Sequence, residues 1–563
     1  MEENHYASKD VRDSVPYVLP RWKLKDETGT PVCNFIPRVL TLIQVCSPDR
    51  NVIEEAVRLS LEFGDGVTQE ITLELSKLQR IDWSKMNSRC ILNENYRNVR
   101  GCIVNIIRAG LHNAPIEIVF QLGRLGVHNI SETVVFNAGD RVFTDPSATK
   151  ADLKFELGNL PFKLDIDPNL TPQEAFKGMR ELIALSPEIG RVLVAHVISG
   201  IVRSAFKEAG LIPCTILVIV GESGMLKSHF IPHLAQLYNR ADGIRAVTRF
   251  NSTKRFIEES LWEYSECTAV IDDLHTAESG GIKRKNEDTA EEIIRRIGDN
   301  TGRGYMEGHR QIQKQFMGNV VFIGEYTIGR ASTIPRELVV KITKRPNGEI
   351  LDKYQRHQPL LVSTFYSFFI QWYVDHFDVI RNEIDKRLTE LRKTSVNSNI
   401  HGRLCDTKFY LQISFMLFLE FCKEAGFITE EDERDEYMDF SSQLNDLISE
   451  QQARFKSNIQ AEKIDYLNLI RNLYTEGRFC VAKKKKDFNP DKHEGVICYD
   501  CLCLRGKYLE RKIKNINASL RLEDCIQGLL AQNALKLVEN KNTVQISGTG
   551  GKRFYAVKLD KLI

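Results

Sequence analysis

The chain lacks the features that mark membrane proteins, exported proteins and strongly charged proteins. It has no run of about 18 or more apolar residues, so we predict no membrane-spanning helix and no membrane partner. Its first residues, MEENHYASKDVRDS, contain no apolar core of a signal peptide. Its 77 Lys and Arg residues nearly balance 75 Asp and Glu residues, and the net charge of +2 excludes an overall basic field. Contacts with nucleic acid would therefore need local basic patches.

Cysteine is present without the pattern of a small disulfide-bonded domain. The 13 cysteines are odd in number and scattered along the chain, which is typical of a reducing compartment. We therefore expect a cytoplasmic protein. The 563 residues are too many for a single core and predict three or four domains.

The stretch GESGMLKS, residues 221–228, is close to a phosphate-binding loop. The usual pattern is G-x-x-x-x-G-K-[ST], and Leu226 stands where the second glycine belongs. The apolar run Thr215–Val220 before it predicts a buried strand, and the helical spacing of Phe230, Leu234 and Leu237 after it predicts a helix. This is the setting that a phosphate loop requires. We predict an ATP-binding loop that comprises Gly221, Glu222, Ser223, Gly224, Met225, Leu226, Lys227 and Ser228.

Two side chains of this loop have specific predicted roles. Lys227 would reach the β- and γ-phosphates of ATP, and the hydroxyl of Ser228 would ligate Mg²⁺. We expect ordinary helical dihedral angles at Leu226, because it lies where the loop enters the helix. The alternative is a chance glycine turn between a strand and a helix.

A second apolar run ends in two carboxylates. Thr268–Ile271 predict a buried strand, and Asp272 and Asp273 follow it directly. Beside a phosphate loop, such a pair serves Mg²⁺-dependent ATP hydrolysis: we assign Asp272 to the metal ion and Asp273 to the attacking water. The alternative is a solvated turn or a helix cap.

Two further elements follow in chain order and resemble P-loop ATPases of the AAA+ type. Val320–Ile323 predict a strand that ends before Glu325, and this resemblance implies that Glu325 or Thr327 senses the γ-phosphate. Arg336 precedes the strand predicted over Leu338–Ile342, where an arginine can reach the ATP of a neighbouring subunit. A surface arginine at the start of a strand is the alternative for Arg336.

The stretch between the acidic strand and the strand before Glu325 predicts a helix and then a hairpin. Ala290, Ile293, Ile294 and Ile297 lie at helical spacing, and GRGYMEGHRQIQKQF has the alternation of a hairpin with a turn at Glu307–Arg310. The hairpin carries three basic side chains that we assign to DNA binding, His309, Arg310 and Lys314. The alternative is a purely structural hairpin.

The stretch from about residue 186 to residue 344 resembles the MCM-like AAA+ helicases of mobile genetic elements, of the Cch type carried by staphylococcal cassette chromosome elements. The resemblance rests on GESGMLKS, AVIDDLH, RRIGDNTGRGYM and FIGEYT, and on QLGRLGVHNISETVVFNAGDRVF nearer the N-terminus. It implies a hexameric DNA helicase that uses ATP and Mg²⁺, acts on single-stranded and forked DNA, and serves replication of the element. An element-encoded primase or DNA-binding protein would be its partner. Glu325 departs from the asparagine of MCM proteins.

The remaining chain completes a multidomain α/β prediction with four domains. We place an N-terminal α+β accessory domain at 1–160, an AAA+ core with a parallel sheet and a hairpin before sensor 1 at 161–345, a helical lid or bundle at 346–452, and a winged-helix domain at 453–563. Residues 52–66 and 97–113 are predicted as helices, and 116–123 and 132–143 as strands. Cys480, Cys498, Cys501 and Cys503 would be either a zinc site or, for the last two, small apolar residues on one face of a strand.

Three functions are compatible with these patterns. The favoured one is an ATP-dependent DNA helicase ring, because a hairpin with a basic tip suits translocation. The alternatives are a DNA-binding replication initiator or helicase loader that is switched by ATP without unwinding, and a degenerate ATPase in which Leu226 blocks turnover. Intact Lys227, Ser228, Asp272 and Asp273 argue against the degenerate ATPase.

Overall fold

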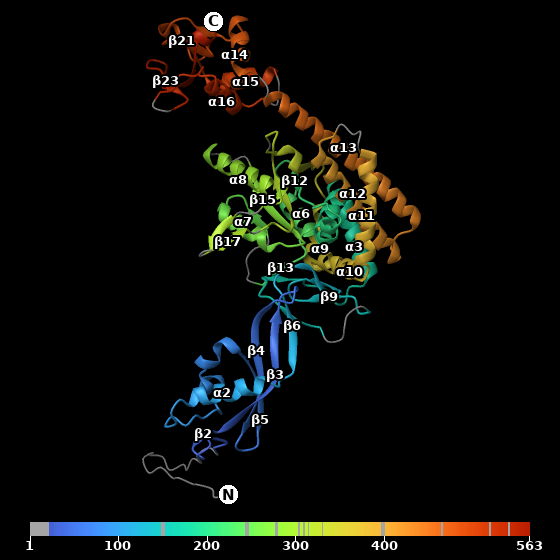
Figure 1. Ribbon diagram of the computed structural model, residues 1–563. Helices are drawn as coiled ribbons and strands as arrows, with labels where there is room; N and C mark the ends of the chain where they lie inside the picture. The colour runs from blue at the N-terminus through green and yellow to red at the C-terminus, as the bar shows by residue number, and fades with distance from the viewer. Residues whose placement is uncertain are drawn as a thin grey trace.

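The computed structural model describes most of the chain and arranges it in three parts (Figure 1). An N-terminal part built on long strands leads into a central sheet with a large helical cluster, and the long helix α13 leads out to a C-terminal part. The described residues are 22–147, 153–241, 247–275, 280–301, 304–307, 310–313, 315–328, 330–395, 400–462, 465–516, 520–538 and 541–562.

The N-terminal part contains two sheets of three or more strands. The larger has the strand order β10-β6-β3-β4-β5, and the smaller has the order β7-β8-β9. Their elements and the short ones around them are β1 (Leu24–Lys25), β2 (Pro31–Cys33), β3 (Phe35–Cys46), β4 (Val52–Phe63), β5 (Thr68–Glu74), η1 (Leu75–Arg80), α1 (Trp83–Met86), α2 (Val99–Leu111), β6 (Ile116–Leu122), β7 (Gly126–Ile130), β8 (Thr133–Asn137), β9 (Val142–Thr144) and β10 (Lys154–Leu157). The helix predicted at 97–113 and the strand predicted at 116–123 are confirmed, whereas the stretch 132–143 forms two antiparallel strands, β8 and β9, with a turn between them.

The helix predicted over 52–66 is wrong, because this stretch forms β4. Val57, Leu59, Leu61 and Phe63 are buried, and the residues between them are more exposed, which is the period of two residues that a strand shows. β4 pairs antiparallel with both β3 and β5, so its backbone groups are satisfied by neighbours that are distant in sequence. Alternation therefore outweighs the approximate helical spacing of the same apolar residues.

The central part is built on a parallel sheet of strand order β14-β15-β18-β12-β19. Its strands are rich in β-branched residues and are almost entirely buried, as in a sheet covered by helices on both faces. The elements of this region are β11 (Phe162–Lys163), α3 (Pro172–Ala184), α4 (Pro187–Ile201), α5 (Arg203–Glu208), β12 (Ile216–Val220), α6 (Lys227–Ala235), β13 (Asn239–Arg240), β14 (Val247–Arg249), α7 (Lys254–Glu263), β15 (Thr268–Leu274), α8 (Gly280–Gly298), β18 (Asn319–Gly324), η2 (Ile334–Arg336) and β19 (Glu337–Lys341).

A short hairpin lies between α8 and β18, as the sequence predicts. β16 (Gly304–Glu307) pairs antiparallel with β17 (Arg310–Gln313), and Glu307 faces Arg310 across the pair. The helix predicted before it is also confirmed, because Ala290, Ile293, Ile294 and Ile297 are all buried within α8.

Five helices follow the sheet and share its apolar core. They are α9 (Gly348–His357), α10 (Leu361–Asp375), α11 (Phe377–Ser395), α12 (Gly402–Glu424) and α13 (Glu430–Glu462). One continuous cluster of buried apolar side chains extends from Leu125 through the sheet to Ile448, so these helices are packed onto the central sheet. Within the described residues, no helix is long and apolar enough to cross a membrane.

The C-terminal part has its own core and a five-stranded sheet of order β20-β21-β22-β24-β23. Its elements are α14 (Tyr466–Thr475), β20 (Val481–Ala482), η3 (Lys485–Asp487), β21 (Gly495–Cys498), β22 (Cys501–Leu504), α15 (Gly506–Ile516), α16 (Leu522–Ala531), β23 (Val544–Gln545), β24 (Arg553–Lys558) and η4 (Leu559–Lys561). Cys501 and Cys503 are both buried among apolar side chains. Across the described chain, no group of three or more His, Cys, Asp or Glu is placed to hold a metal ion.

Candidate nucleotide site

The predicted phosphate loop lies between β12 and α6, at the carboxyl end of the central sheet. β12 ends at Val220, and α6 begins at Lys227. Gly221 is needed because the chain directly after β19 passes close by: a Cβ atom at Gly221 would lie 2.1 Å from Cγ2 of Ile342. Gly224 has a φ of +86°, which glycine adopts without steric cost. The loop therefore packs tightly at its start and turns freely in its middle.

The expectation of helical dihedral angles at Leu226 is wrong. Leu226 has φ 57° and ψ 17°, which is the left-handed region. Its carbonyl oxygen accepts hydrogen bonds from the backbone N–H groups of His229 and Phe230, so this residue starts α6 from a left-handed conformation. A left-handed conformation costs a residue other than glycine roughly 1–2 kcal/mol. The second glycine of the usual pattern is thus replaced by leucine at the position where glycine is sterically favoured.

Comparing Leu226→Gly with Leu226→Ala tests this backbone conformation. Both substitutions remove the leucine side chain, but only glycine relieves the left-handed strain. We expect the glycine variant to be more stable than the alanine variant by about 1 kcal/mol. If residue 226 had helical dihedral angles, alanine would be the more stable by roughly 0.5–1 kcal/mol. The sign of the difference between the thermal unfolding midpoints of the two variants decides between these cases.

The two predicted aspartates lie at the end of β15, within an irregularity of the sheet. The pairing of β15 with β18 shifts register between Ile271 and Leu274, so Asp272 and Asp273 bulge out of the ladder. The backbone N–H of Asp273 donates to Oδ1 of Asp272 at 2.7 Å, and Asp273 has a φ of 78°. This bulge turns two consecutive carboxylates toward the phosphate loop, whereas a regular strand would direct them to opposite faces.

Lys227 and Glu325 complete the group of charged side chains. β18 lies between β12 and β15 in the sheet, so Glu325, which follows it, is placed between the phosphate loop and the aspartates. The Nζ atom of Lys227 donates to the carbonyl oxygens of Gly221 and Glu222, both at 2.7 Å. Burial lowers the pKa of the Lys227 ammonium, and the carboxylates of Glu325 and Asp272 partly offset that effect. These two carboxylates therefore favour the charged lysine.

Lys227, Asp272, Asp273 and Glu325 line one open pocket of about 350 Å³, whereas Gly221 and Glu222 of the predicted loop are not among its walls. Its walls are Ser223, Gly224, Met225, Leu226, Lys227, Ser228, His229, Asp272, Asp273, Leu274, His275, Ile323, Gly324 and Glu325. A helix N-terminus, a lysine, a hydroxyl and three carboxylates fit a phosphate chain with a divalent cation, because the first two bind phosphate and the oxygen ligands suit Mg²⁺. The pocket thus joins elements that are up to about a hundred residues apart in the sequence.

Other predicted site residues lie outside this pocket. Arg336 is held within its own subunit by Asp299, with 2.7 Å between its Nη2 and Oδ1 of Asp299. His309 and Lys314 lie outside the described residues, and Arg310 is described only as part of the backbone of β17. The structure therefore does not bring the predicted finger, Arg336, to the phosphate loop of the same subunit.

Two features of the site escaped sequence reasoning. His275 contacts the aspartate pair, with 2.9 Å between its Nδ1 and Oδ1 of Asp273. A second pocket of about 370 Å³ adjoins the first, shares Ser228 and His229 with it, and reaches α9 and α10. In the described chain, Nε2 of His233, Nε2 of Gln236 and the hydroxyl of Tyr238 are buried without a hydrogen-bond partner, and all three residues line this pocket. The available signal was the spacing of His229 and His233 on one face of α6, with Gln236 directly after the helix.

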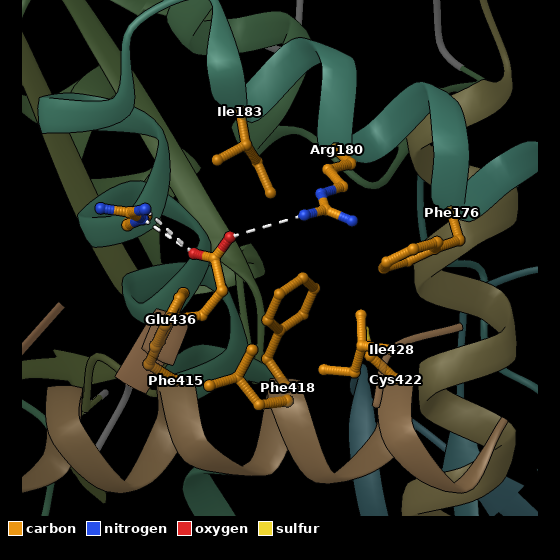
Figure 2. Close-up of a pocket in the computed structure, with 10 residues that line it drawn as sticks. Phe176, Arg180, Ile183, Phe415, Phe418, Cys422, Ile428 and Glu436 are labelled. Carbon is orange, nitrogen blue, oxygen red and sulfur yellow. Dashed lines mark hydrogen bonds and ion pairs between the residues drawn. The ribbon is translucent and has the colours of Figure 1, made fainter. Parts of the chain in front are cut away.

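Another cavity lies between α3, α12 and α13 and has a structural character. It has a volume of only about 40 Å³ and is lined largely by apolar side chains, among them Phe176, Phe415 and Phe418 (Figure 2). The carboxylate of Glu436 points toward Arg180 and also pairs with Arg191, at 3.0 Å from its Nη2. This cavity is a packing space beside an ion-paired glutamate, and it carries no candidate chemistry.

Comparison with known proteins supports the fold. No family model and no curated protein matches the sequence. Among solved structures, the chain is similar to SCCmec type IV Cch, described as an active helicase, with 13% identity over 95% of each chain and a TM-score of 0.53. The predicted resemblance to a Cch-type helicase is therefore confirmed at the level of the fold, over nearly the whole chain.

Two further solved structures are more distant. One is a JCV helicase bound to a small molecule, with 12% identity over 44% of this chain and 67% of that chain, and a TM-score of 0.24. The other is an apo form of the NrS-1 C-terminal region, with 10% identity over 92% of this chain and 96% of that chain, and a TM-score of 0.27. Their TM-scores are too low to indicate a shared fold.

Proposed function

We propose that the protein is an ATP-dependent DNA helicase that works as a hexameric ring and unwinds or translocates on DNA during replication of a mobile element. One observation carries the proposal: Lys227, Ser228, Asp272, Asp273 and Glu325 line a single pocket at the carboxyl ends of three adjacent strands. The Cch-like fold supports a motor that uses this pocket. The central part is an AAA+ core in this proposal, and the C-terminal part is a winged helix.

Each residue of the pocket has a separate role in phosphoryl transfer. The backbone N–H groups of the loop and the Lys227 ammonium hold the β- and γ-phosphates. Ser228 and Asp272 would hold Mg²⁺, which would neutralise negative charge on the phosphate oxygens. Asp273 orients the attacking water, Glu325 senses the γ-phosphate, and His275 fixes the Asp273 carboxylate by its contact at 2.9 Å. In-line attack by this water then yields ADP and phosphate.

The nucleoside of ATP would bind in the second pocket. It begins at Ser228 and His229, where the phosphate site ends, and continues along α6 toward His233 and Gln236. Burial lowers the pKa of His233 to about 4, so its imidazole is neutral at pH 7 and suits hydrogen bonding with an uncharged ring. The base of ATP would satisfy polar groups that have no partner in the described chain.

Arg336 acts on the ATP of the neighbouring subunit in this proposal. Asp299 pairs with Arg403 at 2.8 Å as well as with Arg336, so the removal of Arg336 leaves Asp299 with a partner. We therefore expect Arg336→Ala to fold and bind ATP, and to lower kcat by about 1,000-fold or more. Mixing Arg336→Ala with Lys227→Ala subunits should restore hydrolysis, because some interfaces then combine an intact finger with an intact loop. ATPase assays on mixed subunits check this, and the absence of any rescue would count against a finger in trans.

The hairpin β16–β17 would grip DNA in the central channel of the ring. Met306 of β16 is 61% exposed although it is apolar, which fits a hairpin that projects from the core and meets a ligand. Arg310, with His309 and Lys314, supplies positive charge for the DNA backbone. ATP turnover that moves this hairpin would draw the strand through the ring.

Substitution of the hairpin cations separates a helicase from a DNA-binding switch. In Arg310→Ala with Lys314→Ala, DNA-stimulated ATP hydrolysis and unwinding should fall while hydrolysis without DNA stays at the wild-type rate. Lys207→Ala with Lys393→Ala is the control, because it removes two exposed cations from α5 and α11. An equal loss of all three activities would make the hairpin a structural element. If the hairpin variant unwound DNA at the wild-type rate, the hairpin would not contact DNA during translocation.

A further inference from the structure

Two basic segments of the C-terminal part meet although they are about sixty residues apart. Lys483–Lys486 follow β20, and Ser547 follows β23, and these strands are the opposite edges of the sheet. Nζ of Lys485 nevertheless lies 3.3 Å from Oγ of Ser547. Ala482, beside the first segment, and Ile546, beside the second, belong to one apolar cluster, so the sheet curls and joins its two edges.

We call the lysine run after β20, together with the turn from Ser547 to Arg553 that leads into β24, the lysine edge. Its side chains are exposed except for that of Lys485, which is half-buried, and in the described part of the chain none of them forms an ion pair. Asp487 is the carboxylate next to the lysine run, and Glu494 nearby is already paired with Arg511 and Lys512. The cations of the lysine edge are Lys483, Lys484, Lys485, Lys486, Lys552 and Arg553.

The backbone of the lysine edge is also open to a ligand. Gly548, Gly550 and Gly551 have φ values of +84°, +66° and +73°, and nothing lies within 4 Å of a Cβ atom placed at Gly550. A glycine turn without side chains lets another polymer approach its backbone N–H groups closely. The turn therefore adds neutral donors to a row of cations.

Helix α16 is poorly suited to DNA. It is the second of the consecutive helices α15 and α16, the position from which a helix-turn-helix reads the major groove. Leu522–Ala531 contain no Lys or Arg, and Glu523 and Asp524 lie in the first turn. Carboxylates at that end would repel the phosphate backbone. Between α16 and the sheet edge, only the sheet edge carries a cluster of cations.

We propose that the C-terminal domain holds DNA by its sugar-phosphate backbone along the lysine edge, without reading base sequence. Lysine is a common phosphate ligand and is depleted from protein–protein interfaces, which favour aromatic anchors. No exposed large apolar side chain of the described chain lies in Lys483–Lys486 or Ser547–Arg553. The chemistry of the edge therefore fits a polyanion better than a protein partner. The inference rests on the proposed function only in taking DNA as the polymer.

The salt dependence of DNA binding tests the lysine edge in the full-length protein. Lys484→Ala with Lys552→Ala is compared with Lys507→Ala with Lys514→Ala, which removes the same charge from exposed positions of α15. Binding of a fluorescent duplex and of a single strand is followed by anisotropy without nucleotide, from 50 to 200 mM salt. Each phosphate contact contributes a slope of about 0.9 in log Kd against log salt on duplex DNA. Over this range, wild type should therefore lose about 10-fold more duplex affinity than the test variant.

The remaining outcomes overturn the inference. A test variant with the wild-type salt slope on both DNAs would show that the lysine edge makes no phosphate contact. An equal decrease of the salt slope in the test and control variants would show that net charge alone causes the effect. A normal slope with a changed oligomeric mass would make the edge a contact between subunits. ATP hydrolysis without DNA is measured in the same samples: its absence in the wild type would count against the proposed function and not against the lysine edge.

Discussion

Lys227→Ala should abolish ATP hydrolysis, with a fall in kcat of about 100-fold or more. The Lys227 ammonium is the cation at the start of α6, and it faces the carboxylates of Asp272 and Glu325 across the pocket. Without it, no side-chain charge of the phosphate loop opposes the charge that develops on the γ-phosphate. The substitution should change nucleotide chemistry and leave the fold intact. The hydrogen bonds described for the ammonium go only to carbonyl oxygens of its own loop.

Release of phosphate, with saturating ATP and Mg²⁺, measures this prediction. Lys341→Ala is the matched control, because Lys341 is an exposed lysine at the end of β19, the neighbouring strand of the same sheet. It should hydrolyse ATP at the wild-type rate. A wild-type rate in Lys227→Ala would show that the loop does not hold the reacting phosphates.

Asp273→Asn should separate ATP binding from hydrolysis. Asparagine tolerates a positive φ nearly as well as aspartate does, so the φ of 78° at this position can be kept. The neutral amide, however, can neither polarise the attacking water nor accept a proton from it. We expect kcat to fall by about 100- to 1,000-fold, while the Kd for ATP changes by no more than a few fold.

The control for this substitution is matched in backbone conformation. Asp500 lies in the turn between β21 and β22 with a φ of 55°, so Asp500→Asn makes the same chemical change at a left-handed position outside the pocket. It should leave hydrolysis unchanged. Nucleotide binding is followed with a fluorescent ATP analogue, and hydrolysis by phosphate release. If Asp273→Asn hydrolysed ATP normally, the water would be oriented by another group; if it lost ATP binding, Asp273 would belong to the metal site instead.

The pocket at the carboxyl ends of the central strands was predictable because its parts have strong local signals. Buried runs rich in β-branched residues lead directly into Gly221, Asp272 and Gly324–Glu325, and parallel strands in one sheet must present those ends at one edge. The hairpin was predictable for a similar reason, since alternation and a turn are encoded within about ten residues.

The features that the sequence did not predict depend on contacts between residues that are distant along the chain. β4 is a strand because β3 and β5 flank it, and its own residues also satisfy an approximate helical pattern. The left-handed Leu226 is set by the geometry of the loop and by the start of α6, not by a preference of leucine. The contact of Lys485 with Ser547 joins two opposite edge strands, next to an apolar cluster that contains both Ala482 and Ile546.

Strand displacement on a forked DNA duplex tests the central claim most directly. Full-length wild type and Lys227→Ala are incubated with a fork whose displaced strand is fluorescent, with and without ATP and Mg²⁺. The account predicts displacement that requires ATP and that Lys227→Ala lacks. DNA binding and ATP hydrolysis by the wild type without displacement would contradict a helicase and would make the protein an ATP-switched initiator or loader.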